Sequence, residues 1–240
     1  MRLEGARVVL TGVSRGVGLE ILRLLLSKGS LVAACARNKG DLTDADRGRF
    51  QFHMLDVSDP VQANRLINSA TNAFEGLDVL INNASVTHDL KMIEEITSED
   101  VLNCYQNNVF SIFNTLRYSL PIMKSQRNGL IINFSSRCGR RAIPRLAAYC
   151  STKFAVRGIT EAVAKETEGT ELRCISISPA GINTQMRRGL FGEEEARQQQ
   201  TPERIADIVC KIIRGEIKVP NGSDVVIFKD VEPIIKVPEQ

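Results

Sequence analysis

Thr11-Gly-Val-Ser-Arg-Gly-Val-Gly18 is a glycine-rich segment between a predicted strand and a predicted helix. Residues 7–10, which are apolar after Arg7, come directly before it and predict a buried strand, and leucines and an isoleucine recur at helical spacing over residues 17–28. Glycines let such a turn bend tightly and approach a pyrophosphate, which then lies at the positive end of the helix. A simple turn is the alternative, but the place between a strand and a helix favours a dinucleotide-binding site.

Apolar runs and helical patterns alternate along the rest of the chain. Fully apolar strands are typical of a parallel sheet that helices cover on both faces, so we predict an α/β fold with about seven strands and a single domain over residues 1–240. The expected strands are 7–10, 31–36, 50–55, 79–81, 130–134, 172–177 and 225–228. The later expected helices are 61–74, 98–125, 149–168 and 202–214, the last with Thr201 as its N-cap.

Two segments near the C-terminus lack these patterns. Residues 189–200 are polar and are predicted to form a mobile substrate flap, with Met186, Leu190 and Phe191 as apolar walls. An exposed loop that packs only on its own fold is the alternative. Residues 229–240 contain two prolines and are predicted to form an irregular tail.

Composition limits the classes of function. The chain has 43% apolar and 25% charged residues, as in an ordinary globular protein, and its net charge of +3 is too small to indicate nucleic acid or an anionic membrane as a partner. We expect no signal or transit peptide, because residues 1–5 run straight into the first predicted strand, and no apolar run approaches the roughly 20 residues that span a bilayer. Six scattered cysteines and two histidines indicate no metal site and favour the cytoplasm. His53 is interpreted as structural, and contact of His88 with a substrate is the less favoured alternative for that residue.

Tyr149 and Lys153 are the strongest candidates for chemistry. They lie four residues apart in Ala148-Tyr-Cys-Ser-Thr-Lys-Phe-Ala155, so a helix places both side chains on one face. An ammonium about 4 Å from a phenol favours the phenolate by roughly 4 kcal/mol at an effective dielectric near 20, which lowers the phenol pKa by about three units. We therefore expect a general acid/base that works near neutral pH. For the pair taken alone, a solvated helix face is the alternative.

Two arginines indicate which dinucleotide binds. An NAD site typically ends its second strand with a carboxylate that binds the ribose 2′-hydroxyl. Here Ala36 occupies that place and Arg37 follows it, while Arg15 lies within the glycine turn. Because guanidinium groups pair bidentately with phosphate, the pattern favours NADP(H) over NAD(H). Two solvated surface arginines are the alternative.

Taken together, the motifs resemble the short-chain dehydrogenase/reductase family over nearly the whole chain. The matching pieces are Thr-Gly-x-x-x-Gly-x-Gly (11–18), Asn-Asn-Ala (82–84), Asn108, the pair Ser135 and Ser136, Tyr-x-x-x-Lys (149–153) and Pro-x-x-x-x-Thr (179–184). Their order and spacing agree together, which is far more specific than any one motif. The resemblance implies a Rossmann-type doubly wound sheet, an NADP(H)-dependent oxidoreductase, and a homodimer or homotetramer through helices 103–125 and 149–168.

The resemblance implies roles for four catalytic residues. Tyr149 would exchange a proton with a carbonyl oxygen, and Lys153 would lower the phenol pKa and hold the nicotinamide ribose. Ser136, thirteen residues before Tyr149, would hydrogen-bond the substrate oxygen, and Asn108, 28 residues before Ser136, would hold a water in a proton relay. The adjacent residues that match this spacing less well are Ser135 and Asn107.

The resemblance also implies cofactor contacts beyond the glycine turn. Ile182 and Thr184 would contact the nicotinamide carboxamide, Asp56 would hydrogen-bond the adenine, and Asn82 and Ala84 would lie beside the adenosine ribose. The complete expected cofactor set is Gly12, Ser14, Arg15, Gly16, Val17, Gly18, Arg37, Asp56, Val57, Asn82, Ala84, Tyr149, Lys153, Pro179, Ile182 and Thr184.

The chain departs from the family pattern at three places. Ser85 stands where relatives often have glycine, and Ala180 interrupts a Pro-Gly pair, which is tolerated only if its φ is not positive. The C-terminal end lacks the Gly-Gly that often follows the last strand. Because this end often helps to build the family's tetramer, the departure puts the assembly in doubt.

The segment between Ser136 and Tyr149 borders the expected substrate cleft. Its arginines would attract an anionic or polar heteroaromatic substrate, although a solvated loop or a subunit contact is the favoured alternative. These arginines are Arg137, Arg140, Arg141 and Arg145. Cys138 and Cys150 flank the catalytic residues and are interpreted as inert thiols, because no basic partner for either is apparent in the sequence.

Within the family, Tyr-Cys-x-x-Lys (149–153), Ala162-Val-Ala-Lys-Glu166 and Gly181-Ile-Asn-Thr184 resemble the plant-type NADPH-dependent pterin aldehyde reductases. A carbonyl reductase that acts on a small aldehyde or ketone is the broader expectation. The alternative from another class is a dinucleotide-binding scaffold or sensor without turnover. The presence of all four catalytic residue types weighs against that alternative.

Overall fold

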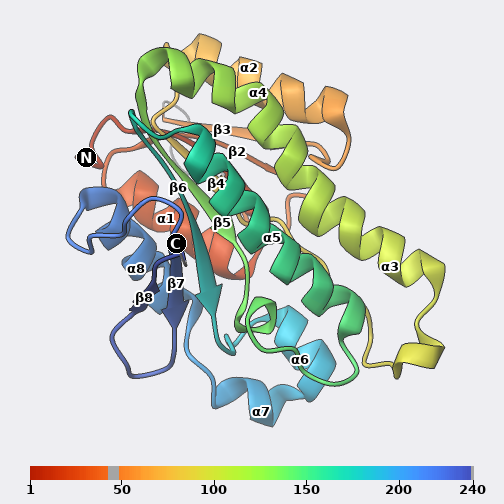
Figure 1. Ribbon diagram of the computed structural model, residues 1–240. Coiled ribbons are helices and arrows are strands. Elements are labelled where there is room, and N and C mark those ends of the chain that lie inside the picture. The colour runs from red at the N-terminus through yellow and green to blue at the C-terminus, as the bar shows by residue number, and fades with distance from the viewer. Residues whose placement is uncertain (43–48, 239–240) are drawn as a thin grey trace.

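Strands and helices alternate along the chain, as the apolar runs predict (Figure 1). The computed structural model describes residues 1–42 and 49–238. Within them, eight strands form one sheet in the order β3-β2-β1-β4-β5-β6-β7-β8. The strands are β1 Arg7–Thr11, β2 Leu31–Ala36, β3 Phe50–Met54, β4 Val79–Asn82, β5 Asn128–Phe134, β6 Glu171–Pro179, β7 Asp224–Ile227 and β8 Ile234–Lys236.

Strands β1 to β7 run parallel, and β8 pairs antiparallel with β7. The strand order reverses at β1, which pairs with β2 on one side and with β4 on the other. A reversal of this kind leaves a crevice at the carboxyl ends of the strands. The prediction of a doubly wound parallel sheet is confirmed.

Helices cover both faces of the sheet (Figure 1). The apolar sides of α1 and α8 pack on one face, and those of α2, α4 and α5 pack on the other. The helices are α1 Gly16–Ser27, α2 Pro60–Phe74, α3 Ser98–Tyr105, α4 Ser111–Gln126, α5 Ala147–Glu166, α6 Gln185–Phe191, α7 Glu193–Arg197 and α8 Pro202–Arg214, with the 3-10 turns η1 Ile93–Glu95 and η3 Arg137–Gly139 and the π-helix η2 Gln106–Phe110. In the part of the chain that the structure describes, no helix has the length and apolar character needed to cross a membrane.

Local signals explain where several helices begin and end. The Asp59 side chain accepts hydrogen bonds from two backbone N–H groups in the first turn of α2, and Pro60 occupies the first helical position. Thr201 and Pro202 start α8 in the same way, as the sequence predicts. Gly215 ends α8 in the left-handed conformation, with a φ of +78°.

Three segments differ from the sequence prediction. The predicted helix 98–125 is divided into α3, the π-helix η2 and α4. The predicted flap 189–200 contains the end of α6 and all of α7, and its mobility stays a prediction. The predicted irregular tail 229–240 contains β8, which makes the strand count eight instead of about seven; residues 239–240 lie outside the described residues. A strand of three residues between two prolines is too short to leave a period in the sequence.

The turn between β1 and α1 requires glycine for two reasons. Gly12 and Gly16 have φ values of +77° and +58°, a region that strains residues with a Cβ. In addition, a Cβ on Gly18 would lie 2.1 Å from the carbonyl oxygen of Gly12, and one on Gly12 would lie 2.7 Å from the Cα of Ala84. The glycines thus let the start of α1 lie directly against the ends of β1 and β4.

We expect Gly18→Ala to destabilise the fold, because the new Cβ overlaps the Gly12 carbonyl. Overpacking of this kind costs about 1–3 kcal/mol, and each kcal/mol lowers the unfolding midpoint of a chain of this size by about 2–4 °C. The matched control is Gly189→Ala in α6, where a new Cβ meets nothing within 4 Å. Thermal unfolding followed by circular dichroism measures both midpoints, and an equal fall in the two variants would contradict the packing argument.

Candidate active site

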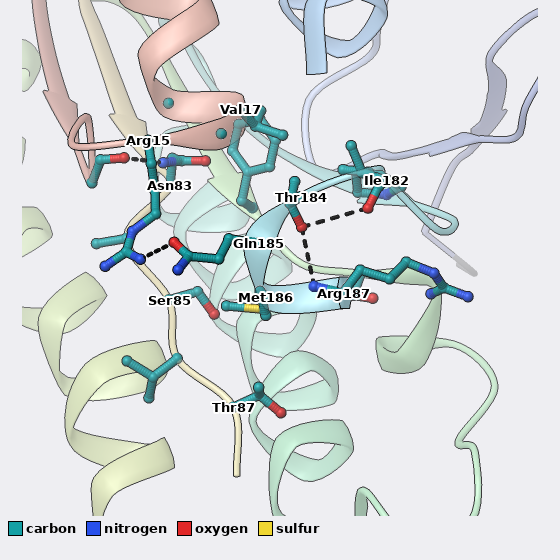
Figure 2. Close-up of a pocket in the computed structure, with 18 of the residues that line it drawn as sticks. Arg15, Val17, Asn83, Ser85, Thr87, Ile182, Thr184, Gln185, Met186 and Arg187 are labelled. Atoms are coloured by element: carbon teal, nitrogen blue, oxygen red, sulfur yellow. Dashed lines mark hydrogen bonds between the residues drawn. The ribbon is translucent and has the colours of Figure 1, made fainter. Parts of the chain in front are cut away.

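A cleft of about 1700 Å³ runs along the carboxyl ends of the strands. Its walls come from the β1–α1 turn, the segments that follow β2, β3 and β4, η3, the start of α5, the segment after β6, and α6 (Figure 2). Most residues that the sequence predicted for a site line this one cleft. They are Gly12, Ser14, Arg15, Gly16, Val17, Gly18, Arg37, Asp56, Val57, Ala84, Ser136, Tyr149, Lys153, Pro179, Ile182 and Thr184.

Asn82, which the sequence places in the cofactor set, does not line this cleft. Asn82 ends β4 and is buried, with its Nδ2 donating to Asn133 Oδ1 at 2.8 Å and its Oδ1 accepting from Thr115 Oγ1 at 2.8 Å. Thr115 belongs to α4, so the Asn82 side chain faces the helices and not the cleft. Asn83 lines the cleft instead, and its Nδ2 donates to the carbonyl oxygens of Thr11 and Gly12. Successive side chains of a strand point to opposite faces, which is the signal that separates the two asparagines.

Tyr149 and Lys153 lie on one face of α5, as their spacing predicts. Lys153 Nζ lies 5.6 Å from the centre of the Tyr149 ring and donates a hydrogen bond of 2.9 Å to the carbonyl oxygen of Phe134. The Lys153 side chain is buried, whereas Tyr149 keeps part of its surface open to the cleft. The hydrogen bond joins the first turns of α5 to the end of β5.

The electrostatics of this pair differ from the prediction. Burial raises the pKa of Tyr149, the charge of Cys138 adds to this rise, and hydrogen bonding with Ser136 lowers the pKa only in part. Burial also lowers the pKa of Lys153 to about 8. Burial therefore disfavours the phenolate that the sequence predicts. The phenol stays protonated and is available as a proton donor.

Ser136 is the serine that faces Tyr149. It precedes η3, where its Oγ accepts a hydrogen bond of 3.1 Å from the backbone N–H of Cys138. The hydroxyl of Ser135 is buried and donates instead to the carbonyl oxygen of Lys153 at 2.8 Å. The two adjacent serines thus have separate tasks, one in the cleft wall and one in the packing of η3 against α5.

Asn108 is fully buried in the π-helix η2 and does not line the cleft. Its Oδ1 accepts from the hydroxyl of Ser85 and the N–H of Val86, and its Nδ2 donates to the carbonyl oxygen of Val86 and to Thr152 Oγ1. An amide side chain offers two donors and two acceptor lone pairs, so these bonds use all of its capacity. The Asn108 side chain therefore fixes the segment after β4 against α5 and has no group left for a water.

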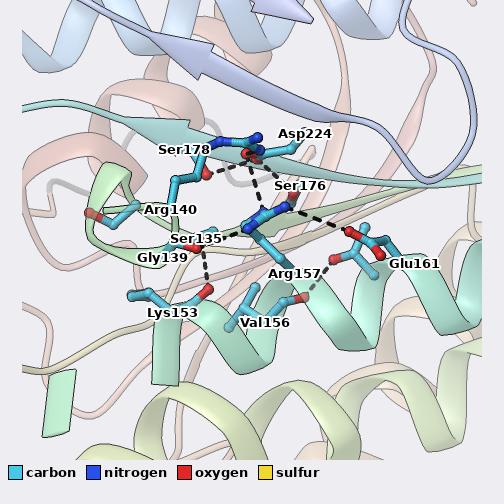
Figure 3. A network of polar contacts seen from close by, with 12 residues as sticks. Ser135, Gly139, Arg140, Lys153, Val156, Arg157, Glu161, Ser176, Ser178 and Asp224 are labelled. Atoms are coloured by element: carbon cyan, nitrogen blue, oxygen red, sulfur yellow. Dashed lines mark hydrogen bonds and ion pairs between the residues drawn. The ribbon is translucent and has the colours of Figure 1, made fainter. Parts of the chain in front are cut away.

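A buried carboxylate connects the far strands to the site (Figure 3). Asp224 in β7 accepts hydrogen bonds from the hydroxyls of Ser176 and Ser178 in β6 and from Arg140 Nη1 at 2.7 Å. Arg157 Nε in α5 lies 3.5 Å from the same carboxylate as an ion pair, and Arg157 Nη1 donates to the carbonyl oxygen of Gly139. One carboxylate thus holds η3 and α5, the two segments that carry Ser136 and Tyr149, against the sheet.

The two arginines proposed for a phosphate both have amide partners. Arg15 donates to Gln185 Oε1 on α6, and Figure 2 shows these side chains meeting across the cleft. Arg37 Nη1 donates to Asn107 Oδ1 at 3.3 Å. Both partners are uncharged, and neither belongs to the cofactor-binding residues that the sequence predicts. Contacts between segments 70 and 170 residues apart leave no local signal in a sequence.

Comparison with known proteins identifies the family. The sequence model described as short chain dehydrogenase matches residues 6–195, which include the glycine turn, Ser136 and the Tyr149–Lys153 pair. The chain belongs to the short chain dehydrogenase family.

Three members of the short chain dehydrogenase family illustrate the similarity. The chain is 31% identical over 227 residues to an NADPH-dependent pterin aldehyde reductase of Arabidopsis thaliana, with 92% of both chains covered. It is 29% identical over 238 residues to a 3-oxoacyl-(acyl-carrier-protein) reductase of Thermotoga maritima, covering 92% of this chain and 96% of that protein. The solved structure of ElxO with NADP bound matches with a TM-score of 0.84 and 25% identity, covering 92% of this chain and 96% of the other.

The departures from the short chain dehydrogenase pattern are accommodated by the backbone. Neither Ser85 nor Ala180 has a positive φ, and both line the cleft. The Ser85 hydroxyl donates to Asn108 Oδ1 at 3.0 Å, a hydrogen bond that a glycine does not make. The serine therefore adds a contact between the segment after β4 and η2.

The four arginines after Ser136 have different surroundings. Arg140 is ion-paired with Asp224, and Arg145 donates to the carbonyl oxygen of Leu90, so neither lines the cleft. Arg137 lies with its guanidinium carbon 5.5 Å from the centre of the Phe228 ring, and it lines the cleft together with Arg141. The four therefore do not form one cluster.

Helix α6 lines one part of the cleft. Met186, Leu190 and Phe191 line it, as predicted for apolar walls, and Arg187 also lines it while pairing with Glu195 of α7. Thr184 caps the start of α6 by accepting from the N–H of Arg187 (Figure 2). His88 is buried and does not line the cleft. Its position therefore does not favour contact with a substrate.

We expect Lys153→Met to be more stable than the wild type near neutral pH. In the folded protein the pKa of Lys153 is lowered to about 8, against about 10.4 in an unfolded chain. Below pH 8 the folded protein carries this buried charge. Between pH 8 and about 10.4 the folded state releases a proton that the unfolded state keeps, so stability from this group rises with pH. Removal of the buried charge should raise the free energy of unfolding by up to about 3 kcal/mol. Loss of the hydrogen bond to Phe134 should reduce this gain by roughly 1 kcal/mol.

Urea unfolding at several pH values tests this expectation. The difference between Lys153→Met and the wild type should be largest below pH 8 and should shrink as the pH rises. Lys165→Met, on the exposed side of the same helix, is the matched control and should show no such dependence. A difference in unfolding free energy that stays constant with pH would show that burial does not disfavour the charged form of Lys153.

Proposed function

We propose that this protein is an NADP(H)-dependent oxidoreductase that reduces a small aldehyde or ketone, with Tyr149 as the general acid/base. The observation that carries the proposal is the placement of Tyr149, Lys153 and Ser136 in one cleft with the glycine turn. Family membership supports oxidoreductase chemistry, and the residues of the cleft support the finer assignment.

The residues present fit a bound NADP(H). Around Gly12 and Gly18 a Cβ would fill the cradle in which the backbone approaches a pyrophosphate. Strand β2 ends at Ala36 without a carboxylate, while Arg15 and Arg37 face the cleft with uncharged amide partners. A ribose 2′-phosphate would replace these amides without the loss of an ion pair. When bound, the dinucleotide supplies the hydride; the NADPH-dependent reductase from Arabidopsis and the NADP-bound ElxO support this choice.

Protonated Tyr149 would donate its phenolic proton to the substrate oxygen as negative charge develops there. Its raised pKa keeps the proton in place at neutral pH, which suits the direction of reduction. The Ser136 hydroxyl would donate a second hydrogen bond to the same oxygen and stabilise the transition state. Because the pKa of Lys153 is lowered to about 8, its ammonium releases a proton more readily than that of an ordinary lysine. It could therefore return a proton to Tyr149 after the phenol has donated its own.

Asn108 would hold neighbouring segments of the site in place and would not contact the substrate or the cofactor. Its saturated side chain holds the Ser85–Val86 backbone and Thr152 in place. A water relay, as the sequence analysis expected, would therefore use backbone groups of the π-helix η2 instead of the Asn108 amide. Single π-helical turns are frequent at functional sites because they displace backbone groups from the regular hydrogen-bond ladder.

Apolar surface supports self-association. Phe110, Phe113 and Phe154 are 49%, 53% and 43% exposed, and they lie on or beside α4 and α5, which neighbour each other in Figure 1. Aromatic side chains are enriched at protein contacts. We therefore retain a homodimer or homotetramer through these helices as part of the proposal.

We expect Tyr149→Phe to lose turnover at least about a hundredfold while it still binds NADPH, since removal of a general acid commonly costs 10²–10⁴ in rate. Oxidation of NADPH is followed in the spectrophotometer against aldehydes, ketones and oxidised pterins. The matched control is Tyr118→Phe, because Tyr118 lies on α4 outside the cleft. Turnover that survives in Tyr149→Phe would remove the assignment of the proton donor. Tight NADPH binding by the wild type without turnover of any carbonyl would favour the scaffold alternative.

We expect Arg37→Asp to weaken NADPH binding at least about tenfold and to shift the preference toward NADH, because a carboxylate repels a 2′-phosphate and accepts from a 2′-hydroxyl. Fluorescence titration with both dinucleotides measures the ratio of their dissociation constants. Arg65→Asp, an exposed position on α2 outside the cleft, makes the same change in net charge and should leave the ratio unaltered. Stronger NADPH binding by Arg37→Asp would refute the phosphate contact.

A further inference from the structure

Asp224, at the start of β7, is a buried carboxylate outside the cleft. Its side chain is 4% exposed, and strand β8 pairs with this part of β7, with Lys236 opposite Asp224. A charge that is removed from water in this way is costly unless fixed polar groups surround it. The contacts of Asp224 therefore indicate what the carboxylate does.

The two carboxylate oxygens of Asp224 have separate sets of partners (Figure 3). Its Oδ1 accepts hydrogen bonds from the hydroxyls of Ser176 and Ser178, at 2.7 and 2.8 Å. These serines alternate with one residue between them in β6, so both side chains lie on the same face of the sheet. The Oδ2 atom accepts a hydrogen bond of 2.7 Å from Arg140 Nη1 and lies 3.5 Å from Arg157 Nε. The serines thus fix one oxygen, and the other is directed at two guanidinium groups.

Arg140 connects this carboxylate to Ser136. It directly follows η3, and its backbone N–H donates to the carbonyl oxygen of Arg137 at 3.0 Å. The N–H of Gly139 donates in turn to the carbonyl oxygen of Ser136 at 2.8 Å. Because these hydrogen bonds close a short turn, a displacement of Arg140 would also displace Ser136.

Arg157 connects the same carboxylate to the helix that carries Tyr149. It lies in α5, roughly two turns after Tyr149, and its Nη1 donates to the carbonyl oxygen of Gly139 at 3.1 Å. Its Nε has no hydrogen-bond partner among the described residues, so Asp224 attracts this end of the guanidinium by charge alone. The Arg157 side chain therefore joins α5 both to the turn that follows Ser136 and to the carboxylate in β7.

We propose that Asp224 is a positioning residue of the active site. By holding one arginine beside η3 and one in α5, it fixes the Ser136 hydroxyl relative to the Tyr149 phenol. Asp224 does not line the cleft, so it acts through the distance between the two groups that would donate to the substrate oxygen. A displacement of about 1 Å in such a group can cost roughly a hundredfold in rate. The effect on turnover rests on the proposed function, whereas the effect on the structure of η3 does not.

We expect Asp224→Asn to reduce kcat at least about tenfold and to leave the dissociation constant of NADPH close to the wild-type value. Asparagine keeps the size of the side chain but removes the charge that pairs with both arginines. The partners of Asp224 lie in β6, beside η3 and in α5, and not in the glycine turn, so only a general loss of structure would also weaken NADPH binding. The matched control is Asp207→Asn in α8, an exposed carboxylate that pairs with Lys211 outside the cleft and should leave both values unchanged.

Hydrogen exchange followed by mass spectrometry tests the positioning without reference to activity. The backbone N–H groups of residues 139–141 donate to the carbonyl oxygens of Ser136 and Arg137. In Asp224→Asn we expect these groups to exchange at least about tenfold faster, because the turn loses its charge-assisted contact with the sheet. Asp207→Asn should exchange there at the wild-type rate. Equal exchange in Asp224→Asn and the wild type would overturn the proposal.

A variant of Arg140 keeps the test available if Asp224→Asn does not fold. Arg140→Gln removes the same contact from its more exposed side, at a side chain that is 28% exposed. We expect the same fall in kcat and the same faster exchange of residues 139–141. Arg140→Lys, which keeps the charge, should recover part of both. Wild-type kcat and exchange in Arg140→Gln would refute the connection through this arginine.

The two measurements separate failure of this proposal from failure of the proposed function. A wild type that binds NADPH but turns over no carbonyl would refute the proposed function, and the exchange rates would still decide whether Asp224 fixes η3. Turnover in the wild type with an unchanged kcat in Asp224→Asn and Arg140→Gln would refute the positioning role alone.

Discussion

The buried ammonium of Lys153 is the interaction on which the rest of the site depends. A charge leaves water at a high cost unless fixed polar groups surround it, and here the carbonyl oxygen of Phe134 accepts its hydrogen bond. This bond joins α5 to the end of β5 just before Ser135 and Ser136. In return, Ser135 donates to the carbonyl oxygen of Lys153, and Gly139 packs so closely that a Cβ would lie 2.4 Å from that oxygen. Asp224 holds the other side of the same joint through Arg140 and Arg157.

Burial decides the protonation states around this joint. The same low dielectric that raises the pKa of Tyr149 lowers that of Lys153, because both changes avoid a buried charge. A phenol beside an ammonium is therefore not automatically a phenolate. In this protein burial favours the protonated phenol, and the role of Tyr149 as proton donor in the catalytic proposal follows from this.

Uncharged partners keep the cofactor wall ready for an anion. Arg15 and Arg37 contact the amides of Gln185 and Asn107, and no carboxylate of the described residues 1–42 and 49–238 forms an ion pair with either. The Arg15–Gln185 contact also connects the glycine turn to α6, which lines the same cleft.

The parallel sheet, the helices on its two faces, the glycine turn and most of the predicted site residues could be read from the sequence. These features were predictable because hydrophobic period, helix caps and the spacing of Tyr149 and Lys153 are local properties of the chain. Tertiary contacts alone determine that Asn83, and not the side chain of Asn82, faces the cleft, and that the hydrogen-bonding capacity of Asn108 is fully used. They also determine the direction of the Tyr149 pKa shift, because burial is its largest cause and burial is a property of the packed fold and not of local spacing.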